Sequence, residues 1–188
     1  MNRIVYSHEN PERFTVGTVG VPGERAFFLQ ARSASGLNTI AIDKSQVIAL
    51  SERLRELIKD LRRSELASLD ELGLPASSDS APLEFPIEED FTAGVIGFTW
   101  DGTIQRVTVE VQALTEYAEQ ELLSIDADLS DIEEAPDLLR VTLRIFQVRG
   151  FCDMADALVS AGRQPCPFCG LPINPEGHLC PRANGYRR

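Results

Sequence analysis

The sequence predicts an α+β fold in which one arrangement of strands and a helix occurs twice, with mainly antiparallel strands. The segments FTVGTVG (residues 14–20) and FTAGVIG (residues 91–97) agree at four of seven positions. A turn, two further extended runs and a helical pattern follow each segment in the same order. Each unit has one apolar sheet face and one apolar helix stripe to bury, so we expect the two units to pack around a pseudo-twofold axis.

The first unit is expected to span residues 1–64. Its strands are predicted at 14–20, 25–33 and 37–42, where aromatic and branched side chains are frequent. A helix should then begin at Asp43, since this N-cap and Gln46 three residues later can form a capping box. Apolar residues at helical spacing predict its buried face, namely Val47, Leu50, Leu54, Leu57, Ile58 and Leu61.

The second unit is expected to span residues 84–162, after a linker at 65–83 that is rich in Pro, Ser and Ala. Its hairpin is predicted from the Asp-Gly turn in WDGT and from alternating valines in the run TIQRVTVEV. A third strand is predicted in LLRVTLRI, followed by a helix over about 147–161 that ends near Gly162. The buried face of this helix is predicted to contain Val148, Phe151, Ala155, Leu158 and Val159, with Cys152 in the core.

The negative charge of the chain is concentrated in one insertion, residues 113–137. This insertion holds nine of the 29 acidic residues and no Lys or Arg, out of a net charge of −11. Such a segment would be repelled by a phosphate backbone, so nucleic acid is not the expected partner. No run approaches the ~20 apolar residues of a membrane helix, and the N-terminal residues lack the apolar stretch of a signal peptide. We therefore expect a cytoplasmic protein with reduced cysteines and no membrane partner.

The C-terminal module, residues 163–188, carries a metal-binding pattern. Its ligand types are spaced C-x2-C-x8-H-x-C, which brings four soft ligands into a short span. Gly170 suits the tight turn after the first pair, and NPEG suits a reversal that returns the second pair to the first. The pattern predicts one structural Zn²⁺ with tetrahedral coordination. The predicted ligands are Cys166, Cys169, His178 and Cys180.

Several alternatives to this four-ligand site stay open. His178 could be free, the site could borrow Cys152, or the cysteines could form a disulfide or bind no metal. Catalytic zinc is disfavoured, because four protein ligands leave no position for a reactive water. The segment PCPFC resembles part of the zinc-deaminase signature, but the upstream His-x-Glu of that signature is missing here.

No catalytic set can be identified from the sequence, which contains no P-loop, no G-x-S-x-G and no dinucleotide-binding fingerprint. With His178 assigned to the metal, His8 is the one remaining histidine. We expect His8 to be a surface residue, although it could pair with Glu9 or Glu12 as a base.

Two long motifs carry a family resemblance. ERFTVGTVGVPGERAFFLQAR near the start and GRQPCPFCGLPINPEGHLCPRANGYRR at the end resemble the actinobacterial family DUF3090, over nearly the whole chain. The resemblance implies no established activity and no catalytic residue. Genes for a histidine-phosphatase-like and a lipid-kinase-like protein accompany the family, which implies a pathway of phosphorylated small molecules.

These observations lead to two hypotheses about function. The first is a zinc-stabilised cytoplasmic adaptor whose partner is a protein, since a closed metal site and a basic tail occur without catalytic residues. The second is an enzyme or binder of a phosphorylated metabolite. In that case arginines would have to gather in one concave anion site, and the candidates are Arg13, Arg25, Arg32, Arg163 and Arg182.

Overall fold

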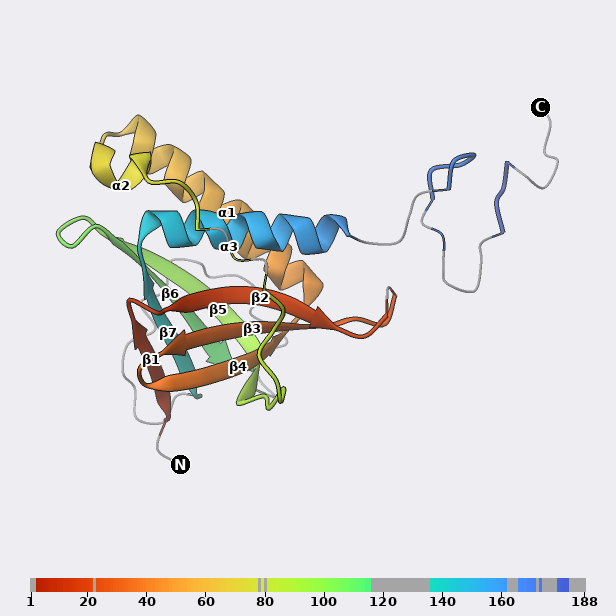
Figure 1. Cartoon of the computed structure of the whole chain (residues 1–188), viewed down its shortest axis with the longest axis horizontal. Coiled ribbons are helices and arrows are strands. Elements are labelled where there is room, and N and C mark those ends of the chain that lie inside the picture. Colours follow the sequence, from red (N-terminus) through yellow and green to blue (C-terminus); the bar gives the residue numbers. More distant parts are fainter. Residues whose placement is uncertain are drawn as a thin grey trace.

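The computed structural model describes residues 3–21, 23–77, 79, 81–115, 136–161, 166–171, 173 and 179–182. In this part of the chain a seven-stranded sheet combines with three helices, which confirms the predicted α+β class (Figure 1). The strand order is β1-β7-β6-β5-β4-β3-β2. Both halves of the chain therefore contribute to one continuous sheet. None of the helices in the described ranges is long and apolar enough to cross a membrane.

The first half of the chain supplies four strands. β1 (Val5–Glu9) is followed by β2 (Arg13–Val19), β3 (Ala26–Ser33) and β4 (Gly36–Ile42). β2, β3 and β4 pair antiparallel, as predicted, whereas the sequence did not indicate β1 as a separate strand. The side chains at the centre of these strands are buried in the core.

The second half supplies β5 (Phe91–Asp101), β6 (Arg106–Ala113) and β7 (Leu138–Leu143). These three strands also pair antiparallel, in the predicted order. The two halves meet at parallel pairings, of β4 with β5 and of β1 with β7. The alternation in β6 is confirmed, since Val107, Val109 and Val111 are all buried.

A very short connection joins the two edges of this sheet. β1 and β2 are the first and last strands in the spatial order, yet only residues 10–12 separate them in the chain. A flat seven-stranded sheet would be about 29 Å across, whereas this connection can span about 14 Å. The sheet must therefore curl until its edges approach, and β1 does contact β3. Asn10, with a φ of 50°, forms the turn between the two strands.

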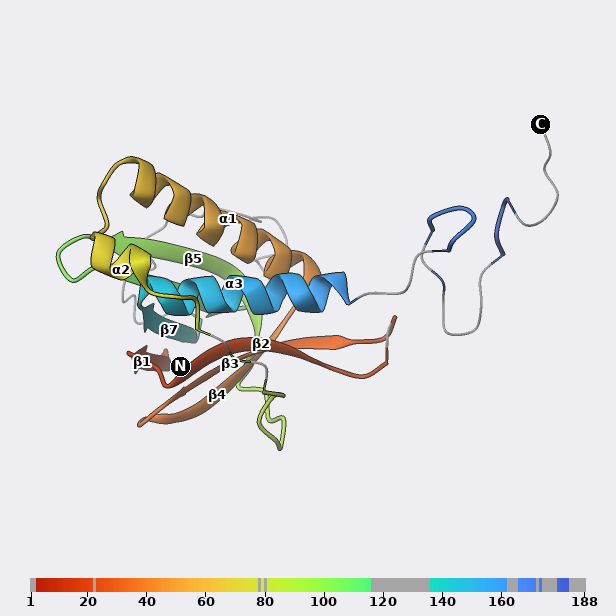
Figure 2. The ribbon, with the colours of Figure 1, turned by 45° about the horizontal axis from the view of Figure 1, so that its top comes forward.

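Two long helices cover one side of the strands. α1 (Lys44–Arg63) and α3 (Ile145–Ser160) lie side by side in Figure 2 and contact each other directly. The predicted stripe of α1 is buried, with Leu57 only partly so, and α3 stacks Phe151 on Phe14 of β2 at 4.9 Å between ring centroids. Arg55 of α1 also pairs with Asp153 and Asp156 of α3 at 2.9 and 2.6 Å.

Both long helices begin with the same hydrogen bond. The Oε1 atom of Gln46 accepts from the backbone N–H of Asp43 at 3.0 Å, as the predicted capping box requires. Gln147 accepts from the N–H of Arg144 in the same way at 2.9 Å. Each glutamine then donates to a neighbouring strand segment, Gln46 to the carbonyl of Gly94 and Gln147 to the carbonyl of Pro11. These side chains fix where the helices start relative to the sheet.

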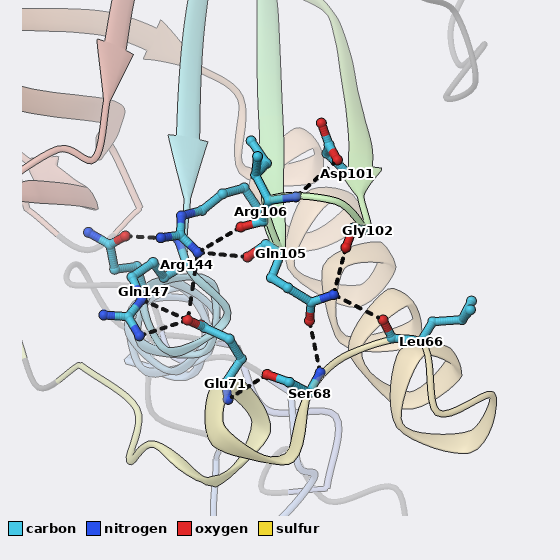
Figure 3. Close-up of polar contacts among 10 residues, drawn as sticks. Leu66, Ser68, Glu71, Asp101, Gly102, Gln105, Arg106, Arg144 and Gln147 are labelled. Atoms are coloured by element: carbon cyan, nitrogen blue, oxygen red, sulfur yellow. Dashed lines mark hydrogen bonds and ion pairs between the residues drawn. The ribbon is translucent and has the colours of Figure 1, made fainter.

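The predicted linker, residues 65–83, is a packed strap and contains the helix α2 (Leu69–Gly73), which the sequence analysis missed. Glu71 of α2 is buried and its Oε1 accepts from Nη2 and Nε of Arg144 at 2.7 and 3.0 Å (Figure 3). Gln105 ties the strap to the β5–β6 turn by accepting from the N–H of Ser68 and donating to the carbonyl of Leu66. Composition indicated a linker because the anchoring residues lie far away in sequence.

The end of the strap packs on β2 and β3. The Leu83 side chain is buried against Gly17, where a Cβ atom would come within 2.3 Å of Leu83 Cγ. Gln30, buried in β3, exchanges two hydrogen bonds with the backbone of Glu84 and donates to Thr39 Oγ1. The glycine in the middle of β2 is thus required by the strap, beyond any role in the hairpin.

The acidic insertion lies outside the described residues between 116 and 135, so its predicted organisation stays a prediction. Its two ends are described and lie together. Gln112 is in register with Leu138, and the N–H of Ala113 donates to the carbonyl of Asp137 at 2.8 Å.

Replacing residues 116–134 by a short Gly/Ser linker should change the free energy of unfolding by only about 1 kcal/mol, because loop-closure entropy depends weakly on loop length. Thermal and urea denaturation measure the effect. Loss of cooperative unfolding would show that the insertion belongs to the core.

Gly17→Ala should lower the free energy of unfolding by about 1–3 kcal/mol, because the new methyl group overlaps Leu83. In the double variant with Leu83→Ala the loss should be smaller than the sum of the two single losses. Gly73→Ala, at an exposed site with no atom within 4 Å of the added Cβ, is the matched control and should cost little. Strict additivity in urea denaturation would refute the contact between Gly17 and Leu83.

Candidate metal centre and a second polar cluster

A tight turn organises the first cysteine pair. The N–H of Gly170 donates to the carbonyl of Cys166, and the N–H of Cys166 donates to the carbonyl of Leu171, both at 2.8 Å. Gly170 has a φ of 76°, in the left-handed region that side chains disfavour. This turn brings Cys166 and Cys169 to one side, as the C-x-x-C spacing predicted.

Three cysteines converge at this turn. The sulfur atoms of Cys166, Cys169 and Cys180 lie within 4.8 Å of one another. The sulfurs of Cys166 and Cys180 are 3.7 Å apart, much longer than the ~2.05 Å of a disulfide bond. Two thiolates bound tetrahedrally to one zinc ion at ~2.3 Å would be about 3.8 Å apart. The cluster could therefore hold a metal ion, and its spacing fits the zinc geometry.

Backbone donors favour a thiolate at the first position. The backbone N–H groups of Cys169 and Phe168 donate to the Cys166 sulfur and lower the pKa of this thiol to about 6. Burial raises the pKa of Cys169, and the negative charge of a neighbouring Cys166 thiolate raises it further. A cation would relieve this conflict, since metal ions bind cysteine as the thiolate.

The predicted fourth ligand, His178, lies outside the described residues, so its role in metal binding stays a prediction. Arg163, a candidate for the anion site, also lies outside them. Cys152 is placed in the core as predicted, where it lies between α1 and α3 and donates to the carbonyl of Ser51. Burial raises the pKa of the Cys152 thiol to about 11, so this residue is unsuited to a shared metal site.

In the described part of the C-terminal module, three large apolar side chains are exposed. Phe168 is 65% exposed and Leu179 is 86% exposed, and Leu171 is exposed between them in the sequence. The guanidinium of Arg182 donates to the carbonyl of Phe168 at 3.0 Å, which links the two ends of the module. Large apolar side chains thus surround a compact cluster of thiols.

The described candidate arginines are already engaged with other parts of the chain. Arg13 pairs with Asp79 and donates to two strap carbonyls, at Ala81 and Pro82. Arg32 pairs with Glu84, and this hydrogen bond holds the pKa of that carboxyl below its usual range. Arg25 donates to the carbonyl of Ala161 at the end of α3.

One of these arginines borders a cavity. Arg13 lines a half-open cavity of about 470 Å³ together with Asp79, Ser77 and the start of α3. The carboxylate of Asp79 already neutralises the guanidinium there. Arg25, Arg32 and Arg182 do not line this cavity, and the metabolite hypothesis stays a prediction.

His8 was expected at the surface, and this prediction is wrong. Its side chain is 1% exposed because the curled sheet brings β1 against the β3–β4 hairpin. His8 Nδ1 lies 2.7 Å from Ser33 Oγ, and Nε2 lies 2.9 Å from Asn38 Oδ1. Asn38 Nδ2 in turn donates to Asp90 Oδ2 at 3.1 Å. Sequence reasoning missed this cluster because its members are up to 82 residues apart and share no spacing motif.

Comparison with known proteins supports the resemblance noted in the sequence. The model of a family described as "Protein of unknown function (DUF3090)" matches residues 6–180, which include all three clustered cysteines. No match was found among curated proteins or among solved structures.

Elemental analysis should find one zinc ion per chain in protein purified without added metal. Without metal the C-terminal module should lose its structure, so iodoacetamide should modify Cys166, Cys169 and Cys180 in reduced protein. Cys152 lies in the core between the helices and sheet and should react only after unfolding. His178→Ala should weaken zinc retention in a chelator competition if it is the fourth ligand. A Cys166–Cys180 disulfide with no metal under reducing conditions would refute the site.

Proposed function

This chain belongs to the DUF3090 family, and from that premise we propose that it is a zinc-stabilised cytoplasmic adaptor that binds a protein partner through its C-terminal module. One observation carries the proposal. Three thiols converge within a short module whose large apolar side chains are exposed. A structural metal ion would fix the backbone of this module, and the apolar side chains would then form the contact.

The identity of the ion is proposed from chemistry. Thiolate ligands in a tetrahedral arrangement favour Zn²⁺, and His178 completes the set in the proposed site. Free cysteines are typical of a reducing compartment, which supports the cytoplasm as the location. The segment from Cys166 to Arg182 is too short to form a hydrophobic core, so metal binding would supply its folding free energy.

We also propose that the two halves of the fold arose from one duplicated unit. The elements β2-β3-β4-α1 and β5-β6-β7-α3 follow in the same order. Gln46 and Gln147 start the two helices with the same hydrogen bond. A pseudo-twofold relation between the halves would explain both correspondences.

The double variant Cys166→Ser/Cys169→Ser should lose the metal and lose hydrogen-exchange protection only beyond about Gly162, while β2–β7 and α1 remain protected. Hydrogen exchange followed by mass spectrometry measures this directly. Loss of protection throughout the sheet would show that the metal holds the core together, and would remove the main support for a separate binding module.

A second pair of variants tests the contact surface. Phe168→Ser/Leu179→Ser should keep the zinc but reduce capture of partner proteins at least tenfold in a quantitative pull-down. Leu69→Ser is the matched control, because Leu69 on α2 is 85% exposed and lies outside the module. Equal capture by the double variant and the control would refute the adaptor function.

A further inference from the structure

Four polar side chains surround His8 in this cluster, and Ser33 Oγ also lies 2.7 Å from Ser35 Oγ. Asp90 Oδ2 also accepts from the N–H of Thr39 at 2.9 Å, so this carboxylate is fixed beside the β4 backbone. It accepts a further hydrogen bond from Asn38 Nδ2, which turns Asn38 Oδ1 toward His8. An amide oxygen can only accept, so His8 Nε2 must carry the proton that it donates. Nδ1 of the neutral ring is then an acceptor, and it faces Ser33 Oγ.

In the tautomer with the proton on Nε2, Ser33 Oγ donates to Nδ1 and accepts from Ser35 Oγ. This relation is the one that activates a serine: a base lies 2.7 Å from Oγ, and a third group orients the base. Asn38 orients the ring and Asp90 orients Asn38, so both are positioning residues. The His8 ring is held in place in two ways. It is buried on strand β1, and both of its nitrogens have hydrogen-bond partners.

The hydroxyl lies at an accessible turn. Ser33 ends β3 and is half-buried, whereas Ala34 and Ser35 after it are exposed. Gly36, with a φ of 126°, has open space where a Cβ atom would lie. The N–H of Ser35 donates to Ser33 Oγ at 3.3 Å, so the turn holds the hydroxyl in place.

We propose that Ser33 is a nucleophile activated by His8 and that it accepts the acyl group of a small neutral ester. This inference goes beyond the adaptor function and does not depend on the cysteine module.

The reaction balances with the residues present and one water. Ser33 Oγ forms a bond to the ester carbonyl carbon while its proton passes to His8 Nδ1. The carbon–oxygen bond to the leaving alcohol then breaks, and the alcohol departs with the proton from Nδ1. A water molecule next gives a proton to Nδ1 and attacks the acyl-serine, and Oγ recovers that proton as the carboxylic acid leaves.

The charges around the cluster determine the substrate class. Asp90 ends the chain of hydrogen bonds, and Glu88 and Glu89 precede it in sequence. Burial raises the pKa of neighbouring Tyr6, and the charges of Asp90 and Asp137 raise it further. A phosphorylated electrophile would be repelled, so the structure favours an uncharged acyl group.

A small alkyl fluorophosphonate tests the nucleophile directly. Ser33 Oγ should form a bond to phosphorus with loss of fluoride, and peptide mass spectrometry should find the adduct on Ser33 of the full-length protein. Ser33→Ala should remove this adduct, whereas Ser64→Ala, at an exposed serine outside the cluster, should keep it. Ser33→Ala should also lose the release of nitrophenol from p-nitrophenyl acetate, whereas the control variant should keep it.

Two further variants separate activation from a structural role. His8→Gln should lower the labelling rate at Ser33 by a factor of about 10²–10⁴, the usual contribution of a general base. Asn38→Leu should also lower it, because no acceptor then faces Nε2. Circular dichroism would verify folding of each variant.

An unlabelled Ser33 in the wild-type protein would overturn the proposal, and so would equal labelling of folded His8→Gln. The cluster would then be a polar clasp that closes the sheet. The metal content and partner capture of the C-terminal module would be unaffected by either result, so the two proposals fail independently.

Discussion

The connection of residues 10–12 between β1 and β2 is the constraint on which the rest of this structure depends. It joins the two edges of a seven-stranded sheet over a distance far shorter than the width of a flat sheet. The sheet must therefore curl, and its strands then enclose a shared hydrophobic core. The parallel pairing of β1 with β7 and the contact of β1 with β3 both follow from it.

A curled sheet also needs cover: α3 packs on one face of β2 at Phe14, and the end of the strap packs on the other face at Gly17. α1 and α3 pack on each other and on the strands, while the strap crosses from α1 toward β5. Buried polar side chains hold the strap, since Gln30 binds the Glu84 backbone and Glu71 meets Arg144. Burying an amide or a carboxylate is unfavourable without such partners, so these contacts specify one position for the strap.

The two candidate sites arise from opposite kinds of structure. The cysteine cluster is local, because its ligands lie within fifteen residues and a single turn brings the first pair together. The His8 cluster exists only because the sheet curls, since it joins β1, the β3–β4 hairpin and the residue before β5. A local metal module suits a binding role, whereas a rigid, buried histidine in a closed sheet suits orientation of a neighbouring hydroxyl.

The sequence by itself determined the features that depend on short-range chemistry. Strand alternation, the Asp43–Gln46 capping box and the C-x-x-C turn are set by neighbours within a few residues, and each appears as predicted. Only the tertiary structure decided the partners of His8, the ion pair of Glu71 and the need for glycine at position 17. These contacts join residues that are tens of positions apart. The β1–β2 connection brings His8 to its partners, whereas the other two contacts form because the strap packs against α3 and β2. Composition made residues 65–83 resemble a linker, because the groups that hold it belong to β2, β6 and α3.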